Sequence, residues 1–450
     1  MELTQGIIDN LNDLAVGNSC LHGDEGTDTA PQWLIAVDCP VLFAASIAAC
    51  WISQRIPVVS ADLQSDTLLE LCDRLNGMIT DRDIQPIGLP AVRLPMENTG
   101  NKFRKDVTAS GVANPSFAAE KTALVLFTSG STGKKKRISK PFFALFEEIM
   151  NLERNFGAQV QGLPRRTTVS HFHIYGFLFN ILWPLHFGHL LCDDTTFYWE
   201  QILHDGNDGA CIVSSPPHLR VLPAVAGSRQ FNWQRSVIFS SGGPLARDIS
   251  LEIRSVTGIG PVEIFGSTET GGVAFRRQHP ETDTPFTPFS PVKITQNDRD
   301  GLLVQSPWLL QADGWVETGD RIDILQNGQF LLKGRYDTIA KIAGKRVSLT
   351  EMEQFLSNMP EVAGARVFQY IDESQRGRGI LAAVIIPTST APLPSGTAKQ
   401  QLVKTIREQM KRRFDLVTLP RYWRFVPDFP RNAEGKVPLA LLEETVRNGH

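Results

Sequence analysis

The segment 126–140, LFTSGSTGKKKRISK, joins a hydroxyl-rich turn to a dense block of cations after an apolar run. Gly130 and Gly133 let backbone N–H groups approach an anion closely, because glycine carries no side chain. Four hydroxyl groups can donate hydrogen bonds to phosphate oxygens: those of Thr128, Ser129, Ser131 and Thr132. Lys136 and its neighbours add positive charge. We therefore expect a polyphosphate site, although the spacing is not that of the GxxxxGK[ST] loop; a solvent-exposed basic turn is the alternative.

The composition limits the kind of protein and its partners. The chain has 450 residues, of which 42% are hydrophobic and 21% charged, with a formal net charge of −3. This profile is typical of a soluble globular protein with two or three domains, and together with the features below we expect a cytoplasmic protein. It argues against a nucleic-acid partner, because nucleic-acid binders usually carry a strong basic excess. The six cysteines form no CxxC pair, so we expect buried thiols rather than a disulfide framework or a zinc site.

Two features argue against an integral membrane segment. The first residues, MELTQGIIDNLNDLAVG, lack the basic region and the apolar core of a signal peptide. The most apolar segment, 33–51, contains Asp38 and Pro40 and is too interrupted to span a bilayer.

The strand that leads into the phosphate loop is one of several that the sequence predicts. Residues 33–38, 41–54 and 56–62 form a short apolar run, an alanine-rich helix and a β-branched run, which predicts a βαβ unit. Similar patterns recur at 122–130, 211–226, 236–258 and 261–270. We expect an α/β fold of parallel-type sheets layered with helices, in which loops at the carboxyl ends of strands bind ligands.

The last third of the chain has a different pattern. From Gly301, short strands separated by Asp-Gly and Asn-Gly turns predict a small antiparallel β-subdomain. Next come a helix at 348–359 that begins at Ser348 or Thr350, strands at 365–371 and 380–387, and a surface loop at 388–400. We place a boundary near 335–337, which gives a large domain, 1–334, and a small α+β domain, 335–450.

The segment FTSGSTGKKK resembles the phosphate loop of the acid-activating, adenylate-forming (AMP-binding) enzymes, which include acyl-CoA synthetases, aryl-acid ligases, peptide-synthetase adenylation domains and luciferases. Six further segments match motifs of this family in the right order along nearly the whole chain: FHIYG (172–176), SSGGPL (240–245), FGSTE (265–269), GWVETGD (314–320), GRYDTIAKIAGKRVSLTEME (334–353) and PRNAEGKVPLALL (430–442). The chain is therefore identified as a member of this family. The resemblance implies an AMP-binding domain at 1–334 and a mobile lid domain at 335–450.

One departure from the family lies in the phosphate loop itself. Lys135, Lys136 and Arg137 stand where the family usually has Pro-Lys-Gly. The change alters the backbone freedom of the loop, and the added charges either strengthen pyrophosphate binding or face solvent.

The resemblance implies that several motifs bind ATP. Phe265 offers a flat face to adenine, and Thr268 can donate to a phosphate. Glu269 beside phosphates is explained chiefly by a bridging Mg²⁺, with a surface carboxylate as the alternative. Asp320 is expected to accept hydrogen bonds from the ribose hydroxyls, and Arg335 to reach the ribose or form an interdomain salt bridge. Three glycines belong to these motifs: Gly242 and Gly243, which otherwise form a plain turn, and Gly266.

Lys436 is expected to act on the reacting groups. Transfer of AMP joins two anions, the acid and the α-phosphate, so negative charge gathers on the non-bridging oxygens. A lysine on a glycine-flanked loop of the mobile domain can bridge both reactants; a solvated lysine is the alternative. His173, rather than its neighbour His171, matches the family histidine that flanks the acid pocket, and a core histidine is the alternative.

The resemblance also implies a second half-reaction. The small domain turns about Asp337 and presents Ala343 and Gly344, where the missing side chain of the glycine leaves room for a pantetheine thiol. We therefore expect an acid–thiol ligase that uses ATP and magnesium to form an acyl-adenylate, and then loads the acyl group onto CoA or an acyl carrier protein. An adenylation-only enzyme, a non-catalytic nucleotide-binding relative and an ADP-forming phosphotransferase are the alternatives.

The carboxylic acid is only loosely constrained by the sequence. Four aromatic residues in 172–188 suggest an apolar pocket for an aryl acid or a medium-to-long fatty acid, unless they are ordinary core: Phe177, Phe179, Trp183 and Phe187.

Overall fold

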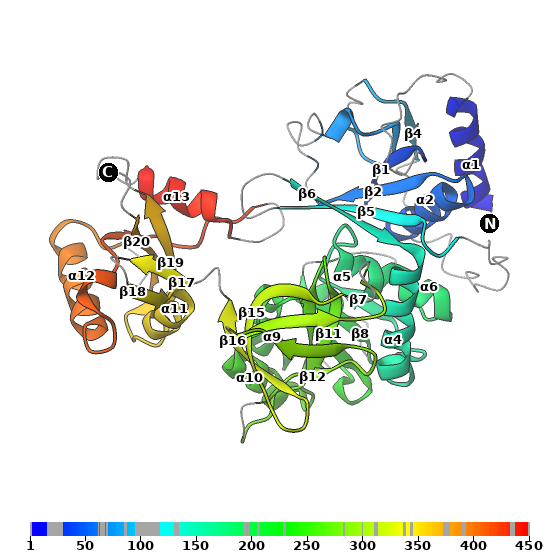
Figure 1. Ribbon diagram of the computed structural model, residues 1–450. Coiled ribbons are helices and arrows are strands. Elements are labelled where there is room, and N and C mark those ends of the chain that lie inside the picture. Colours follow the sequence, from blue (N-terminus) through cyan, green and yellow to red (C-terminus); the bar gives the residue numbers. More distant parts are fainter. Residues whose placement is uncertain are drawn as a thin grey trace.

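The structure is a computed structural model, in which the described residues are 2–15, 30–61, 63, 68, 71–84, 88–94, 118–129, 135–191, 196, 198–204, 208–227, 231–281, 284–298, 300–309, 314–335, 339–342, 345–371, 379–388, 393–432 and 437–448. Figure 1 shows a large lobe and, after β16, a smaller carboxyl-terminal lobe. This arrangement confirms the expected fold class.

The first sheet of the large lobe has the strand order β4-β3-β1-β2-β5-β6. Its strands are β1 (Gln32–Ala36), β2 (Ile56–Ser60), β3 (Gly77–Thr80), β4 (Ala91–Arg93), β5 (Thr122–Ser129) and β6 (Lys135–Pro141). All neighbours are parallel except β5 and β6, which form an antiparallel pair. Helices α1 (Glu2–Ala15) and α2 (Pro40–Ile52) pack together beside this sheet, and the expected βαβ unit is confirmed (Figure 1).

The second sheet has the order β12-β11-β10-β9-β8-β7. Its strands are β7 (Arg165–Thr167), β8 (Cys211–Ser214), β9 (Val237–Ser240), β10 (Val262–Ser267), β11 (Gly271–Arg276) and β12 (Thr287–Pro288). Strands β7 to β10 are parallel, and β11 turns back antiparallel to β10. The helices of this region are α4 (Phe142–Val160), α5 (Ile174–Gly176), a π-helix (Phe177–Leu182), α6 (Trp183–Phe187), α7 (Trp199–Ile202), α8 (Pro216–Leu219), α9 (Leu222–Ala226) and α10 (Arg247–Thr257).

Helix α4 joins the two sheets through one continuous core. Its Phe156 ring meets Phe239 of β9 and Phe275 of β11 edge to face, with centroids 5.2 and 5.4 Å apart. The π-helix that follows the FHIYG motif contributes Phe177 and Phe179 to this core, together with the next residue, Trp183. These three aromatic residues are therefore core residues, which was the alternative to an apolar acid pocket.

The third sheet is antiparallel, with the order β13-β14-β15-β16. Its strands are β13 (Lys293–Gln296), β14 (Gly301–Gln305), β15 (Val316–Ile324) and β16 (Phe330–Arg335). Gly328, of the Asn-Gly turn between β15 and β16, has a φ of +79°, a conformation that glycine adopts without strain. The predicted β-subdomain is confirmed.

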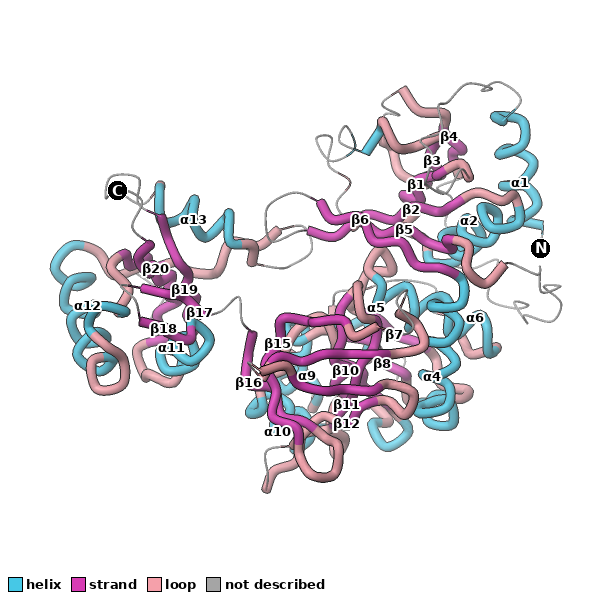
Figure 2. Tube along the Cα trace, in the orientation of Figure 1, coloured by secondary structure: helices cyan, strands magenta, loops and turns pink. Residues whose placement is uncertain are grey.

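The carboxyl-terminal lobe has its own core, to which Met352, Ile385 and Met410 contribute. Its strands are β17 (Ile339–Ile342), β18 (Lys345–Ser348), β19 (Val362–Ile371), β20 (Gly379–Pro387) and β21 (Tyr422–Phe425), and its helices are α11 (Leu349–Ser357), α12 (Gly396–Met410) and α13 (Leu439–Arg447). Figure 2 shows these helices around the strands. The predicted loop 388–400 was partly wrong, because α12 already begins at Gly396.

Two smaller predictions can be compared with the structure. Ser348, rather than Thr350, caps α11, because its side chain accepts a hydrogen bond of 3.1 Å from the N–H of Glu351. Cys50 and Cys211 are buried thiols, whereas the thiols of Cys39 and Cys72 belong to partly exposed residues. In the part of the chain that the structure describes, no helix is long and apolar enough to cross a membrane.

Candidate active site

The cations of the predicted phosphate loop lie on a strand. In the β5–β6 hairpin, Thr128 is paired with Lys136 and Ser129 with Lys135. The sequence placed Lys135–Arg137 in the phosphate loop, and this is corrected here: they already belong to β6, the outer strand of the sheet. Charged side chains are common on such edge strands, because they discourage pairing with another chain. The predicted residues Gly130, Ser131, Thr132 and Gly133 lie outside the described residues.

Lys136 reaches across to the turn between β10 and β11. Its Nζ donates a hydrogen bond of 2.8 Å to Oε1 of Glu269, and both side chains are about half exposed, at 58% and 42%. Burial raises the pKa of the Glu269 carboxyl, but the hydrogen bonds it accepts and the charge of Lys136 outweigh burial, so the pKa lies below its usual value. Glu269 is therefore an anion at neutral pH, as a ligand for Mg²⁺ must be.

The turn that carries Glu269 is tightly built. Ser267 and Thr270 close it with hydrogen bonds from the N–H of each to the hydroxyl of the other, at 3.0 and 3.1 Å. Gly266 is required here, because a Cβ atom at this position would lie 2.1 Å from the carbonyl oxygen of Gly271. Gly271 itself has a φ of +66°. The FGSTE motif thus fixes the direction in which Glu269 leaves the sheet.

Two buried charged residues form hydrogen bonds with the backbone at this turn, and neither was predicted from the sequence. Nζ of Lys140, on β6, donates to the carbonyl oxygen of Glu269 at 3.2 Å. Oε1 of Glu148, on α4, accepts a hydrogen bond of 2.7 Å from the N–H of Gly272. Burial lowers the pKa of Lys140 and raises that of Glu148, while each charge partly offsets the shift of the other. The tertiary structure, rather than any local motif, places both residues at the turn.

The two predicted ribose ligands are neighbours on the third sheet. Asp320 of β15 is paired with Arg335 of β16, and Nη1 of Arg335 lies 3.3 Å from Oδ1 of Asp320. The Asp320 side chain is 14% exposed and that of Arg335 is 48% exposed. Gly319 has a φ of +76°, and a Cβ atom there would lie 3.3 Å from the guanidinium group of Arg335. The glycine of the TGD motif therefore lets the backbone pass close to the guanidinium group of Arg335.

The remaining motif residues of the second sheet lie at strand ends. Gly242 has a φ of +85° in the turn after β9, and Gly243 follows it. The hydroxyl of Ser241 donates to the carbonyl oxygen of Ile264 on β10 at 2.9 Å, which ties this turn to the FGSTE strand. The Phe265 ring is half-buried and packs against Phe286, so part of its surface remains accessible. Thr268 is also half-buried.

The two histidines of the SHFHIYG segment have different environments. His171 is buried, its Nε2 lies 2.9 Å from the carbonyl oxygen of Val37, and its ring centroid is 4.4 Å from that of Phe43. Burial lowers the pKa of His171, so it is a neutral core residue. His173 is half-buried and precedes α5. This difference agrees with the choice of His173 as the pocket histidine, although its role remains a prediction.

Several predicted residues lie outside the described residues, namely Lys436, Asp337, Ala343 and Gly344. Among the described residues, no group of three or more His, Cys, Asp or Glu side chains is arranged to hold a metal ion. Glu269 fits Mg²⁺ as a single carboxylate, because Mg²⁺ commonly takes one or two carboxylates together with substrate phosphates. The site therefore suits a metal ion that is bound together with a nucleotide.

The chain resembles known enzymes over most of its length. Residues 51–301 match the AMP-binding enzyme family, and residues 351–436 match the AMP-binding enzyme C-terminal domain. The chain is 25% identical to a 4-chlorobenzoate–CoA ligase of Arthrobacter sp, over 86% of this chain and 80% of that protein. It is 24% identical to a fatty acid–[acyl-carrier-protein] ligase of Mycobacterium marinum, over 80% of this chain and 76% of that protein.

A solved structure has the same fold. The o-succinylbenzoate coenzyme A synthetase of Bacillus subtilis, in complex with ATP and magnesium ion, superposes with a TM-score of 0.73 at 18% identity, covering 99% of this chain and 93% of that one. Since the two matched regions together span more than half of the sequence, the chain belongs to the AMP-binding enzyme family.

Proposed function

We propose that this enzyme holds Mg·ATP with the β5–β6 hairpin, the β10–β11 turn and the β15–β16 pair, and that Lys436 assists the transfer of AMP to a carboxylic acid. The chain is an AMP-forming acid–thiol ligase, like its relatives, which are CoA ligases and fatty acid–[acyl-carrier-protein] ligases. It activates the acid as an acyl-adenylate, releases pyrophosphate and passes the acyl group to a pantetheine thiol.

The observation that carries the nucleotide site is the ion pair of 2.8 Å between Lys136 and Glu269. Two family motifs that are 133 residues apart in the sequence meet here with opposite charges. An ammonium suits phosphate oxygens, and a carboxylate suits a divalent cation. Mg·ATP offers both charges, so each residue can exchange its protein partner for a ligand partner without leaving a charge unpaired. When bound, Mg²⁺ neutralises negative charge on the phosphates.

In the proposed nucleoside site, Asp320 accepts hydrogen bonds and Arg335 donates them. The Asp320 carboxylate can accept a hydrogen bond from each hydroxyl of the ribose. Nη1 of Arg335 lies 3.3 Å from this carboxylate, so the guanidinium group holds the acceptor in place and is itself close to the proposed ribose position. Phe265 supplies a partly accessible ring for the adenine.

Lys436 is proposed as the catalytic residue of the first half-reaction. The acid oxygen attacks the α-phosphorus, the bond to pyrophosphate breaks, and negative charge grows on the non-bridging oxygens between the two reactants. An ammonium placed there stabilises this charge more strongly than it stabilises the separate reactants. Loss of one such contact typically costs about 3–4 kcal/mol. His173 is proposed to flank the bound acid, and Asp337 to be the hinge of the carboxyl-terminal lobe.

The proposal also concerns which acid is activated and which thiol accepts the acyl group. An aryl or a fatty acid is supported by the relatives, one of which acts on 4-chlorobenzoate and another on fatty acids. The same two relatives use CoA and an acyl carrier protein respectively, so either acceptor is compatible with the family. Ala343 and Gly344 are proposed to line the path of the pantetheine arm.

The test is pyrophosphate exchange into ATP across a panel of aryl and fatty acids, with Lys436→Ala as the matched control. We expect acid-dependent exchange for the wild type and a loss of about 10²–10³-fold in the variant. Presenting CoA and a purified phosphopantetheinylated carrier protein separately then identifies the acceptor. Formation of ADP instead of AMP and pyrophosphate would contradict the proposal.

A further inference from the structure

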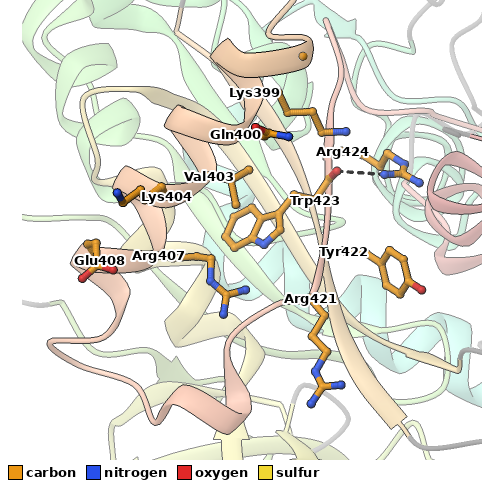
Figure 3. A pocket seen from close by; sticks show the side chains of 11 residues that line it. Lys399, Gln400, Val403, Lys404, Arg407, Glu408, Arg421, Tyr422, Trp423 and Arg424 are labelled. Carbon is orange, nitrogen blue, oxygen red and sulfur yellow. Dashed lines mark hydrogen bonds between the residues drawn. The ribbon is translucent and has the colours of Figure 1, made fainter. Parts of the chain in front are cut away.

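The carboxyl-terminal lobe contains an open groove of about 590 Å³ between α12 and β21. Five of the described lining residues are cationic and one is acidic: Lys399, Lys404, Arg407, Arg421, Arg424 and Glu408. Figure 3 shows Arg407 beside the indole ring of Trp423, whereas Lys399, Arg421 and Arg424 lie farther from the ring. The ring is buried, and its Nε1 donates to the carbonyl oxygen of Pro420 at 2.9 Å. The groove therefore has a rigid aromatic floor and a cationic rim.

Cationic side chains outnumber acidic ones in this region of the sequence. Residues 393–432 hold nine Lys and Arg against three Asp and Glu, a formal net charge of +6, whereas the whole chain has a net charge of −3. Glu408, the acidic lining residue, is already hydrogen-bonded to Lys411. Burial and the nearby charge of Arg424 both lower the pKa of Lys399, so like charges are held close together here. An anionic partner would relieve this repulsion.

The spacing of the cations indicates the size of that partner. Lys399, Lys404 and Arg407 lie on the face of α12 that lines the groove. At 1.5 Å per residue, Lys399 and Arg407 are about 12 Å apart along the helix axis. One phosphate group cannot bridge that distance, whereas carboxylates on successive turns of a helix repeat about every 5.4 Å. The row of charges therefore fits an acidic helix better than a compact phosphate ligand.

We propose that this groove docks an acidic helical surface of the carrier protein that supplies the acceptor thiol. The inference rests on the thiol-transfer step of the proposed function. Strand β21, which forms one wall of the groove, precedes Lys436 in the sequence by only eleven residues, counted from Phe425. The negative charge of such a partner would steer its encounter with the cationic groove.

The test is a direct titration that does not depend on turnover. A phosphopantetheinylated acyl carrier protein with an acidic surface is titrated into the full chain at low and at high salt, by calorimetry or fluorescence anisotropy. The variant Lys399→Glu/Lys404→Glu reverses two groove charges. The matched control Arg412→Glu/Arg447→Glu makes the same charge change at exposed residues that do not line the groove. Circular dichroism checks that both variants are folded.

The inference predicts that the Kd of the carrier protein rises at least about tenfold in the groove variant and stays within about twofold in the control. It also predicts that wild-type binding weakens at high salt. An equal Kd for all three proteins, or no binding to the wild type, would overturn it. A KM for CoA that rises as much as the Kd of the carrier would also overturn it, because the groove would then serve phosphates of CoA. Pyrophosphate exchange, measured on the same wild-type sample, tests the proposed function separately.

Discussion

Lys136 of β6 and Glu269 of the β10–β11 turn form an ion pair of 2.8 Å that links the first sheet of the large lobe to the second. The pair is about half exposed, so solvent screens it and it contributes little to stability. In the proposed function, its importance lies in the two opposite charges that it brings together, one for phosphate and one for a divalent cation.

Replacing Lys136 by methionine removes the charge but keeps most of the volume. Loss of a hydrogen bond to a charged group costs about 1.5–3 kcal/mol, so we expect the KM for ATP to rise about ten- to a hundredfold. Arg137→Met is the matched control, because neighbouring residues of a strand point to opposite faces and Arg137 bonds to Ser139 instead. Steady-state kinetics that show equal losses in both variants would argue against a phosphate role for Lys136.

The ionisation of Glu269 gives a prediction about pH. Its pKa is lowered in the folded protein, so its favourable contribution is present above the ordinary carboxyl value of about 4.5 and is lost as pH falls below it. Removing Lys136 removes its hydrogen bond and its charge, which both lower the pKa of Glu269, while burial, the largest influence, still raises it against the remaining hydrogen bonds. We therefore expect Lys136→Met to lose Mg·ATP affinity at a higher pH than the wild type does. Titrations of Mg·ATP binding between pH 4 and pH 7 measure this, and identical pH profiles would contradict it.

Lys140 and Glu148 are predicted to stabilise the turn that carries Glu269. Lys140→Met leaves the buried Glu148 carboxylate without its nearby cation, which we expect to lower the free energy of unfolding by about 1–3 kcal/mol. Burial already raises the pKa of Glu148 in the wild type, and loss of the Lys140 charge raises it further, so the loss relative to the wild type should grow as pH rises through and above the raised wild-type pKa of Glu148. Urea denaturation at two pH values measures this.

The double variant Lys140→Met/Glu148→Gln is the control for this prediction. The glutamine amide oxygen can still accept from the N–H of Gly272, and no buried charge remains at the two positions. It should therefore be more stable than Lys140→Met alone, and a double variant that is less stable would show that the two residues do not compensate one another.

Much of the fold could be predicted from the sequence, because the deciding signals are local. Asp-Gly and Asn-Gly turns indicated the antiparallel sheet β13–β16, and a serine three residues before a glutamate indicated the start of α11. The strand β6 was missed because three consecutive cations look like a loop, whereas they lie on an edge strand. The start of α12 was missed because Pro394, Ser395 and Gly396 are typical loop residues.

Some residues of the candidate site could be predicted from the sequence, and others could not. Glu269, Asp320 and Arg335 belong to motifs that can be recognised in the sequence, and the structure pairs Asp320 with Arg335. Lys140 and Glu148 could not be predicted, because they bond to backbone groups that are 129 and 124 residues away in the chain, respectively. Only the packing of α4 and β6 against the second sheet brings them there.

Asp320 gives a prediction that is specific to the ribose. The wild type should use 2′-deoxy-ATP less well than ATP, since one hydrogen bond to the Asp320 carboxylate is lost, at about 1.5–3 kcal/mol for a charged acceptor. Asp320→Ala should be slower with both nucleotides but should no longer distinguish them. Comparison of kcat/KM for the two nucleotides measures this. Discrimination that persists undiminished in Asp320→Ala would assign the ribose hydroxyl to another residue.

Ser348 gives a prediction about stability alone. Ser348→Ala removes the hydrogen bond that caps α11, so we expect the free energy of unfolding to fall by about 1 kcal/mol. Thr350→Ala, within the same helix, should change it by less than about 0.5 kcal/mol. Denaturation of the two variants side by side compares the two effects, and a larger loss for Thr350→Ala would be inconsistent with the cap at Ser348.

The most direct test of the central claim is a single-turnover measurement on Lys436→Ala that separates the two half-reactions. If Lys436 contacts the phosphates of ATP bound to the large lobe during acid activation, acyl-adenylate formation by the variant slows by about 10²–10³-fold. Thioester formation from presynthesised acyl-adenylate then keeps nearly its wild-type rate. An unchanged rate of adenylate formation, or an equal loss in both half-reactions, would contradict that role.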